Sequence, residues 1–208
     1  MAFRTVLVGL LSITLAGCSN LVRPPETQGD PAEVLLLDHG RHASLGLPRD
    51  AEIVRYAYGD WRWFALGRRG IREVVRILSG GTEAGLGREI RPDPGDRSSL
   101  RRRLRVPVQQ AFSITVPRSR VASLTRELEE LYRQRLETAV VNPDYGLTFV
   151  RHPEGYGLMH NSNHQVAAWL RALGCEVDVR TPFSRWRIGS RAPTAGSETD
   201  RDPTNGGS

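Results

Sequence analysis

Residues 159–180, MHNSNHQVAAWLRALGCEVDVR, place a helix and a strand directly after one another. The segment from Asn163 to Leu173 predicts a helix, and Gly174 follows it, where glycine commonly ends helices. Cys175–Arg180 then alternates between outward polar and inward apolar positions, which is typical of a half-buried strand. This stretch therefore predicts a helix followed at once by a final strand.

Further strands and two further helices are predicted upstream of this stretch. Apolar, β-branched or aromatic runs predict strands at Glu33–Asp38, Glu52–Tyr58, Phe112–Val116, Tyr145–Val150 and Gly155–His160. Helical spacing predicts helices at Ile71–Leu78 and from Ser119 to about Glu137, and the Gly/Pro/Arg-rich residues 79–103 predict a loop. Because strands and helices are partly segregated, we expect an α+β fold, an antiparallel sheet packed by helices.

The composition excludes several kinds of chemistry. The chain has 208 residues and a net charge of +6, and all 29 basic residues are arginine. The absence of lysine from the sequence excludes a lysine Schiff base, a phosphate-binding Walker lysine and a Ser–Lys dyad. No apolar run reaches the roughly 18–20 residues of a membrane-spanning helix.

The first eighteen residues have the pattern of a secretory signal. Arg4 precedes the apolar run Val6–Ala16, and small residues lead to Cys18. The sequence LAGC at 15–18 resembles a bacterial lipobox, which implies a signal peptide at 1–17 and acylation of Cys18, including palmitate. By resemblance to Gram-negative sorting rules, Ser19 then favours the outer membrane, with the domain facing the periplasm.

The remaining chain divides into three parts by composition. We expect a polar, proline-containing membrane tether at 18–32, one domain at 33–188 and a disordered Gly/Ser/Thr/Pro-rich tail at 189–208. With Cys18 lipidated, Cys175 has no disulfide partner and is predicted to be a small buried thiol. We expect a monomer.

Three polar motifs are candidates for a functional site. They are HGRH at 39–42, YGDW at 58–61 and HNSNH at 160–164. With their flanks, HGRHASLGLP, YAYGDWRWF and MHNSNHQVAAWLRALGCEV, they resemble an uncharacterised bacterial family sometimes labelled urease-associated. That family is similar to permuted papain-like (NlpC-type) hydrolases, in which the histidine precedes the cysteine. The resemblance covers residues 33–180 and implies a single permuted papain-like domain.

The resemblance places a serine where the family has its nucleophilic cysteine. It implies a catalytic set of Ser162, His42 and Asp60, while Arg41 stands at a family tryptophan. Serine is far less acidic than cysteine, so it needs His42 as base, Asp60 to orient the imidazole, and N–H donors for an oxyanion. Alternatively, Ser162 is a helix N-cap without catalytic function, because serine is a favoured cap.

Three functions therefore stay open. The first is a binding domain or pseudoenzyme, the second an amide or ester hydrolase using Ser162 and His42. The third is a structural envelope lipoprotein whose basic run Arg101–Arg105 contacts anionic lipid. The ligand could be a glycan, a peptide or a lipid, and nucleic acid is not expected in the envelope.

The four histidines of two of these motifs are candidate ligands for a zinc ion. His39, His42, His160 and His164 could converge if the papain-like layout holds. However, His160 and His164 are predicted to straddle a strand–helix junction, so they are not a helical ligand pair. We therefore predict no metal and no cofactor.

Overall fold

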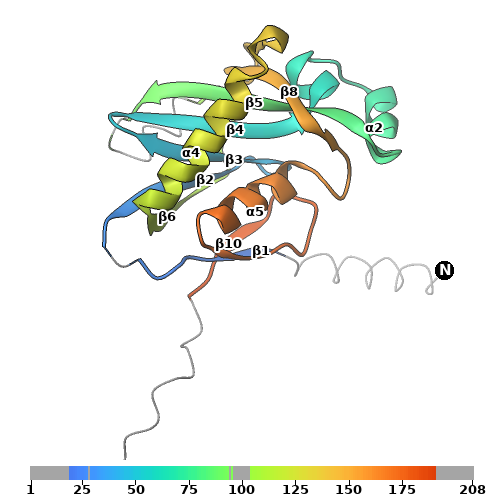
Figure 1. The fold of residues 1–208 in the computed structure, drawn as a ribbon. Coiled ribbons are helices and arrows are strands. Elements are labelled where there is room, and N and C mark those ends of the chain that lie inside the picture. Colours follow the sequence, from blue (N-terminus) through green and yellow to red (C-terminus); the bar gives the residue numbers. More distant parts are fainter. Residues whose placement is uncertain (1–18, 28, 94, 96–103, 191–208) are drawn as a thin grey trace, which may run out of the picture.

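The fold is α+β, as the sequence predicts. The computed structural model describes residues 19–27, 29–93, 95 and 104–190. A seven-stranded sheet has the order β6-β2-β3-β4-β5-β8-β7, with every described pair antiparallel. A smaller sheet of order β10-β1-β9 lies beside it (Figure 1).

The bounds of the elements follow the chain from β1 to β10. The strands are β1 (Asn20–Arg23), β2 (Pro31–Asp38), β3 (Ala43–Arg49), β4 (Glu52–Asp60), β5 (Thr82–Pro92), β6 (Gln110–Pro117), β7 (Val140–Asn142), β8 (Leu147–Tyr156), β9 (Glu176–Asp178) and β10 (Trp186–Ile188). The helices are α2 (Ile71–Leu78), α4 (Arg118–Arg133) and α5 (Ser162–Ala172), with a π-helical turn η1 (Trp61–Ala65) and a 3-10 turn η2 (Leu136–Thr138).

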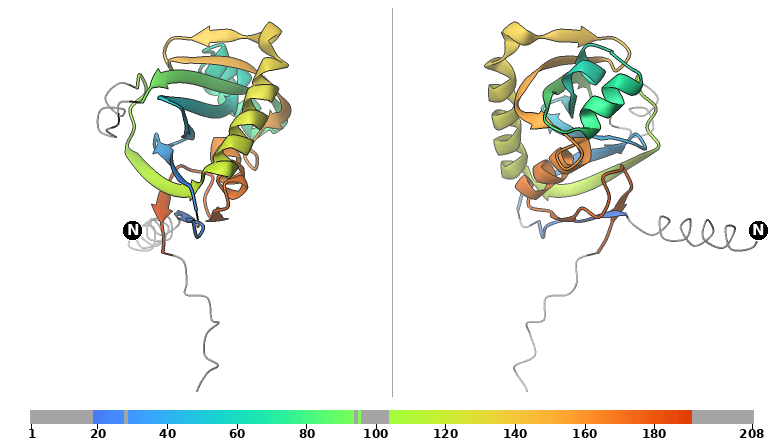
Figure 2. Two further views of the ribbon diagram at one scale, coloured as in Figure 1. Left: turned by 60° about the vertical axis from the view of Figure 1, so that its left-hand side comes forward. Right: turned by 90° about the vertical axis from the view of Figure 1, so that its right-hand side faces the viewer.

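The main core lies between one face of the large sheet and two helices. Helix α4 contacts β2, β3 and β6, and α5 contacts β3, β4 and α4 (Figures 1 and 2). Tyr56 and Leu45 of the sheet are completely buried there, together with Leu170 of α5. This packing fixes the start of α5 against the strands that carry the polar motifs.

The opposite face of the sheet is covered by smaller clusters. Turn η1 packs Trp61 and Phe64 against Leu147 and Phe149. Elsewhere on the sheet Leu35, Leu37 and Ile53 cluster with Leu104 and Val108.

The predicted loop at 79–103 is wrong over much of its length. Residues Thr82–Pro92 form β5, a central strand between β4 and β8. Its glycines provide space for neighbouring rings: a Cβ at Gly87 would lie 2.6 Å from Phe149, and one at Gly85 would lie 3.1 Å from Trp61. The glycines that suggested a loop are therefore requirements of close packing within a strand.

The tether predicted at 18–32 is also partly wrong. Asn20–Arg23 form β1, which pairs with β9 and β10, and β2 already begins at Pro31. Asn20 is fully buried, and its side-chain oxygen accepts hydrogen bonds from the backbone N–H groups of Arg180 and Thr181. The short polar segment therefore belongs to the domain because its hydrogen bonds are made to the C-terminal strands.

Other boundaries differ by a few residues. The two strands predicted at 145–150 and 155–160 are one strand, β8, and α5 begins at Ser162 rather than Asn163. Helix α4 ends at Arg133, before the predicted end at Glu137. The predicted signal peptide, Cys18, Arg101–Arg103 and the tail from 191 onward lie outside the described residues. Within the described residues, no helix is long and apolar enough to span a membrane.

Candidate functional site

A pocket of about 290 Å³ lies at the N-terminal end of α5. Both His42 and Ser162 line it, so the fold brings together two residues that are 120 positions apart in the sequence. Most of the other lining side chains are apolar or aromatic: Trp63, Phe64, Val74, Ile77, Leu78, Tyr156, Leu158, Pro182 and Phe183. Arg41 and Asn161 add polar groups.

Local hydrogen bonds position His42 beside this helix. The β2–β3 connection is a tight turn, in which Gly40 has a φ of +90° and donates its N–H to Asp38 at 2.7 Å. A residue with a side chain rarely adopts this φ, which explains the glycine of the HGRH motif. Asn163 of α5 donates from Nδ2 to the Arg41 carbonyl at 3.2 Å, which ties the turn to the helix start.

Ser162 is the first residue of α5 and does not cap it. Asn161 is the N-cap: its side-chain oxygen accepts from the N–H of Asn163 at 2.9 Å and of His164 at 3.2 Å. The expectation that Ser162 is a helix cap is therefore corrected. Since Ser162 is 1% exposed, its hydroxyl is buried at the pocket wall.

Tyr156 lies beside Ser162 in the pocket wall. Burial raises the pKa of Tyr156 to about 12, and the neighbouring Ser162 acts in the opposite direction. The Asn161 side chain takes up the N–H groups of Asn163 and His164. These are the donors that an oxyanion at the start of α5 would need.

His42 is a half-buried, neutral imidazole at the pocket. Its pKa is lowered from 6.5 to about 4, first by burial and then by Coulombic repulsion from His39 and Arg41. The ring packs edge-on against Phe64, with centroids 4.9 Å apart. Within the described residues, its ring nitrogens have no hydrogen-bond partner, so no carboxylate orients them.

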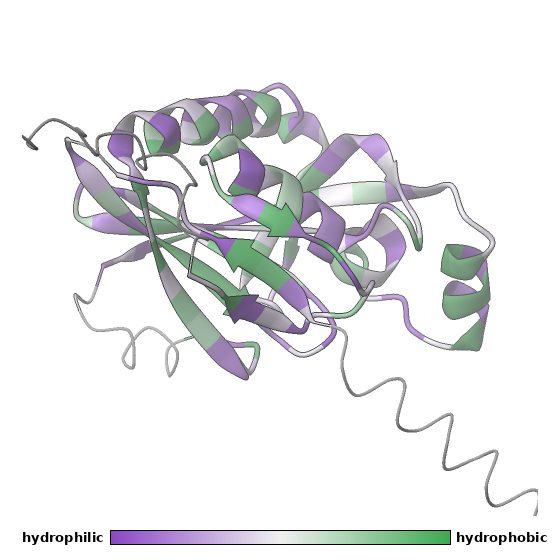
Figure 3. Cartoon of the chain, turned by 90° about the horizontal axis from the view of Figure 1, so that it is seen from below, coloured by the Kyte–Doolittle hydropathy of each residue, from purple (hydrophilic) through white to green (hydrophobic). Residues whose placement is uncertain are grey.

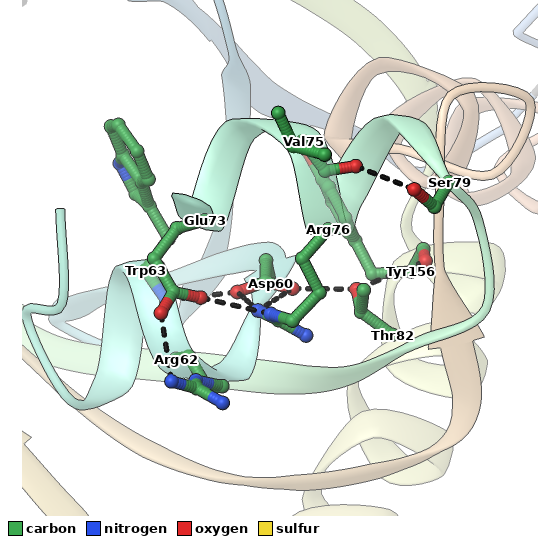
Figure 4. A network of polar contacts seen from close by, with 9 residues as sticks. All are labelled: Asp60, Arg62, Trp63, Glu73, Val75, Arg76, Ser79, Thr82 and Tyr156. Atoms are coloured by element: carbon green, nitrogen blue, oxygen red, sulfur yellow. Dashed lines mark hydrogen bonds and ion pairs between the residues drawn. The ribbon is translucent and has the colours of Figure 1, made fainter. Parts of the chain in front are cut away.

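Asp60 does not serve His42 in this structure, contrary to the prediction. Its carboxylate is completely buried and is taken up by three other groups (Figure 4). Arg76 donates to both oxygens at 2.8 and 2.9 Å, the Thr82 hydroxyl donates at 2.5 Å and the Trp63 N–H donates at 2.9 Å. Asp60 therefore holds α2 and η1 together rather than completing a triad.

The remaining histidines have separate partners. His39 contacts the Pro107 carbonyl at 3.0 Å and the Ser44 hydroxyl at 2.9 Å, which makes it a structural support of the turn. His164 contacts the Asn161 side-chain oxygen at 3.0 Å, and burial lowers its pKa. His160 lies 3.0 Å from Glu154. Over the described part of the chain, His, Cys, Asp and Glu side chains form no group of three or more that could hold a metal ion.

Two pocket residues, Pro182 and Phe183, belong to no sequence motif. They are held over the pocket because Asn161 and Asn163 donate to the Pro182 carbonyl, at 3.2 and 2.8 Å, and Asn20 donates to the Phe183 carbonyl at 3.1 Å. Three asparagines from two distant segments thus position one wall. Only the two asparagines of HNSNH were visible as a motif.

Comparison of the chain with protein-family models, curated proteins and solved structures finds no match.

Proposed function

We propose that this protein is an envelope lipoprotein whose permuted papain-like cleft binds an apolar ligand and no longer hydrolyses it. The observation that carries the proposal is the hydrogen bonding at the start of α5. The N–H groups of Asn163 and His164, which would stabilise an oxyanion there, are engaged by the Asn161 side chain, while the pocket beside them stays open. Loss of such donors typically lowers the rate of acyl transfer by about 10²–10³-fold.

The pocket lining supports an elongated apolar ligand with a small polar or acidic head. Aromatic and aliphatic side chains form most of the wall, which suits a hydrocarbon body. Arg41 offers a cation at the same pocket, and arginine pairs well with carboxylate or phosphate. Among the glycan, peptide and lipid ligands considered, a lipid-like molecule fits best. The proposed location in the bacterial cell envelope follows from the proposed lipid anchor at Cys18.

Titration with a dansyl-labelled fatty acid tests this proposal. Ile77 is a partly buried pocket residue of α2, so Ile77→Trp should fill the pocket and weaken binding about tenfold or more. Val75 lies on the same helix outside the pocket lining, so Val75→Ser should bind like the wild type. Equal affinity of all three proteins, or no binding by the wild type, would refute the proposal.

A serine hydrolase is the second candidate, because His42 and Ser162 line one pocket. In that case a fluorophosphonate probe should modify Ser162, and His42→Ala should abolish the modification. Under the main proposal the serine stays unmodified, since its base has a pKa near 4 and the nearby N–H donors are engaged by Asn161.

A further inference from the structure

Helix α2 is oriented with its apolar face outward. Ile71 is 76% exposed, Val75 55% and Leu78 60%, whereas Glu73 is buried. Glu73 pairs with Arg62 and Arg76, each at 2.8 Å. Figure 3 shows α2 as a mostly hydrophobic helix standing at the edge of the molecule. Ion pairs thus hold the polar face of α2 against the domain and leave the apolar face without a partner among the described residues.

The apolar surface continues across the mouth of the pocket. Val74 and Leu78 of α2 line one side, and Leu158 and Phe183 line the same pocket from other segments. Leu158, Phe183 and the neighbouring Met159 are 49%, 55% and 79% exposed. We define the apolar rim as Ile71, Val74, Val75, Leu78, Leu158, Met159 and Phe183. A contiguous apolar surface of this kind commonly marks an interaction site.

Basic side chains accompany the rim. Arg68 and Arg72 are exposed beside or within α2, and Arg41 is exposed at the pocket. The acidic groups nearby already have partners: Asp144 lies 3.4 Å from Arg69, and Glu154 lies 3.0 Å from His160. An apolar helix face flanked by arginines is complementary to the interface of an anionic bilayer, where acyl chains lie beneath negative headgroups.

The rim also lies close to the proposed anchor. Asn20 is two residues after Cys18, and its side chain is hydrogen-bonded to the carbonyl of Phe183 in the rim. We infer that the apolar rim rests on the surface of an anionic phospholipid bilayer, so that the pocket opens toward lipid. This inference deepens the proposed function, because it specifies where the pocket meets its lipid-like ligand.

Site-specific fluorescence tests the inference without the anchor. In the full chain, Cys18 is replaced by serine and Val75 by cysteine. The new cysteine at position 75 is labelled with the environment-sensitive dye NBD. The matched control is Leu136→Cys, which is 50% exposed in η2, outside the rim. Cys175 stays unlabelled because it is buried, and burial raises its pKa to about 11.

Each protein is mixed with vesicles of phosphatidylethanolamine and phosphatidylglycerol that contain nitroxide-labelled acyl chains. We expect the nitroxide to quench the label at Val75 at least about twice as strongly as the label at Leu136. The double substitution Arg68→Gln with Arg72→Gln should weaken the quenching at Val75. Equal quenching at both positions overturns the inference. A concentration-dependent blue shift at Val75 without lipid also overturns it, in favour of a second copy of the chain as the occupant. The Ile77→Trp titration is independent of both readouts, so a failure of the proposed ligand binding is recognised separately.

Discussion

At the level of single residues, the polar groups of the site have different hydrogen-bond and packing partners from those that a hydrolase needs. Ser162 and His42 share a pocket, yet Asn161 takes up the N–H groups that follow Ser162 and the His42 ring rests on Phe64. Asp60 is paired with Arg76. Each group is stabilised in a conformation that suits packing or hydrogen bonding, and none of these contacts prepares Ser162 for attack.

Replacing Asp60 by asparagine separates its structural function from a catalytic one. Asp60→Asn removes the charge that pairs with Arg76, and we expect the free energy of unfolding to fall by about 2 kcal/mol. The pKa of His42, followed by NMR, should stay near 4, because the two side chains are not bonded. A clear fall in the pKa of His42 in this variant would show that Asp60 does orient the imidazole.

At the scale of elements, two helices position the pocket in different ways. Helix α5 packs its apolar face into the main core, whereas α2 is attached through the ion pairs of Glu73 and Arg76. Turn η1 connects β4 to the segment before α2 and places Phe64 against both His42 and Gly59. The geometry of the pocket therefore depends on this turn.

Gly59 gives a test of that dependence. A Cβ at Gly59 would lie 2.3 Å from the ring of Phe64, so Gly59→Ala must displace a buried aromatic side chain. We expect a loss of about 2 kcal/mol in the free energy of unfolding, measured with urea. Gly157→Ala is the control, because its nearest neighbour would be 3.8 Å away. Equal stability of the two variants would mean that Phe64 is not fixed on Gly59.

The elements that could be predicted from the sequence are those whose local pattern agrees with their environment. Ile71–Leu78 has a helical period and is a helix, and the apolar runs at 33–38 and 52–58 are strands. Strand β5 was missed because its glycines are explained only by the rings of Trp61 and Phe149 on other elements. The outward face of α2 was equally hidden, since its periodicity predicts a buried apolar stripe. The pairs that hold its polar face, Glu73–Arg62 and Arg76–Asp60, join α2 to other elements and form only in the folded domain.

The functional site, too, could be predicted from the sequence only in part. The motifs containing His42 and Ser162 were recognised, and the structure places both at one pocket. The partner of Asp60 could not be predicted, because Arg76 approaches it from another element and carries no motif of its own.

At the scale of the whole molecule, buried neutral histidines make stability depend on pH. Burial lowers the pKa of both His39 and His42 from 6.5 to about 4. Between these values the unfolded chain binds more protons than the folded one, so the free energy of unfolding must fall as the pH falls from 6.5 toward 4. Each histidine contributes on the order of 2 kcal/mol over this range.

Urea unfolding between pH 7 and pH 5 checks this dependence. His39→Gln should clearly reduce the fall in stability, since one of the two histidines with the most strongly lowered pKa is gone. The comparison uses the change with pH within each protein, so a general destabilisation by the substitution does not affect it. Identical pH dependence in the wild type and the variant would contradict the assignment of a neutral, buried His39.

The central claim is that the pocket binds a lipid-like ligand without cleaving it. Native mass spectrometry of the wild-type protein, incubated with a fatty-acyl umbelliferyl ester, tests binding and turnover in one spectrum. We expect a complex whose added mass is that of the intact ester, with no acylated protein and no released fatty acid. Ester cleavage that depends on Ser162, or the absence of any complex, would contradict it.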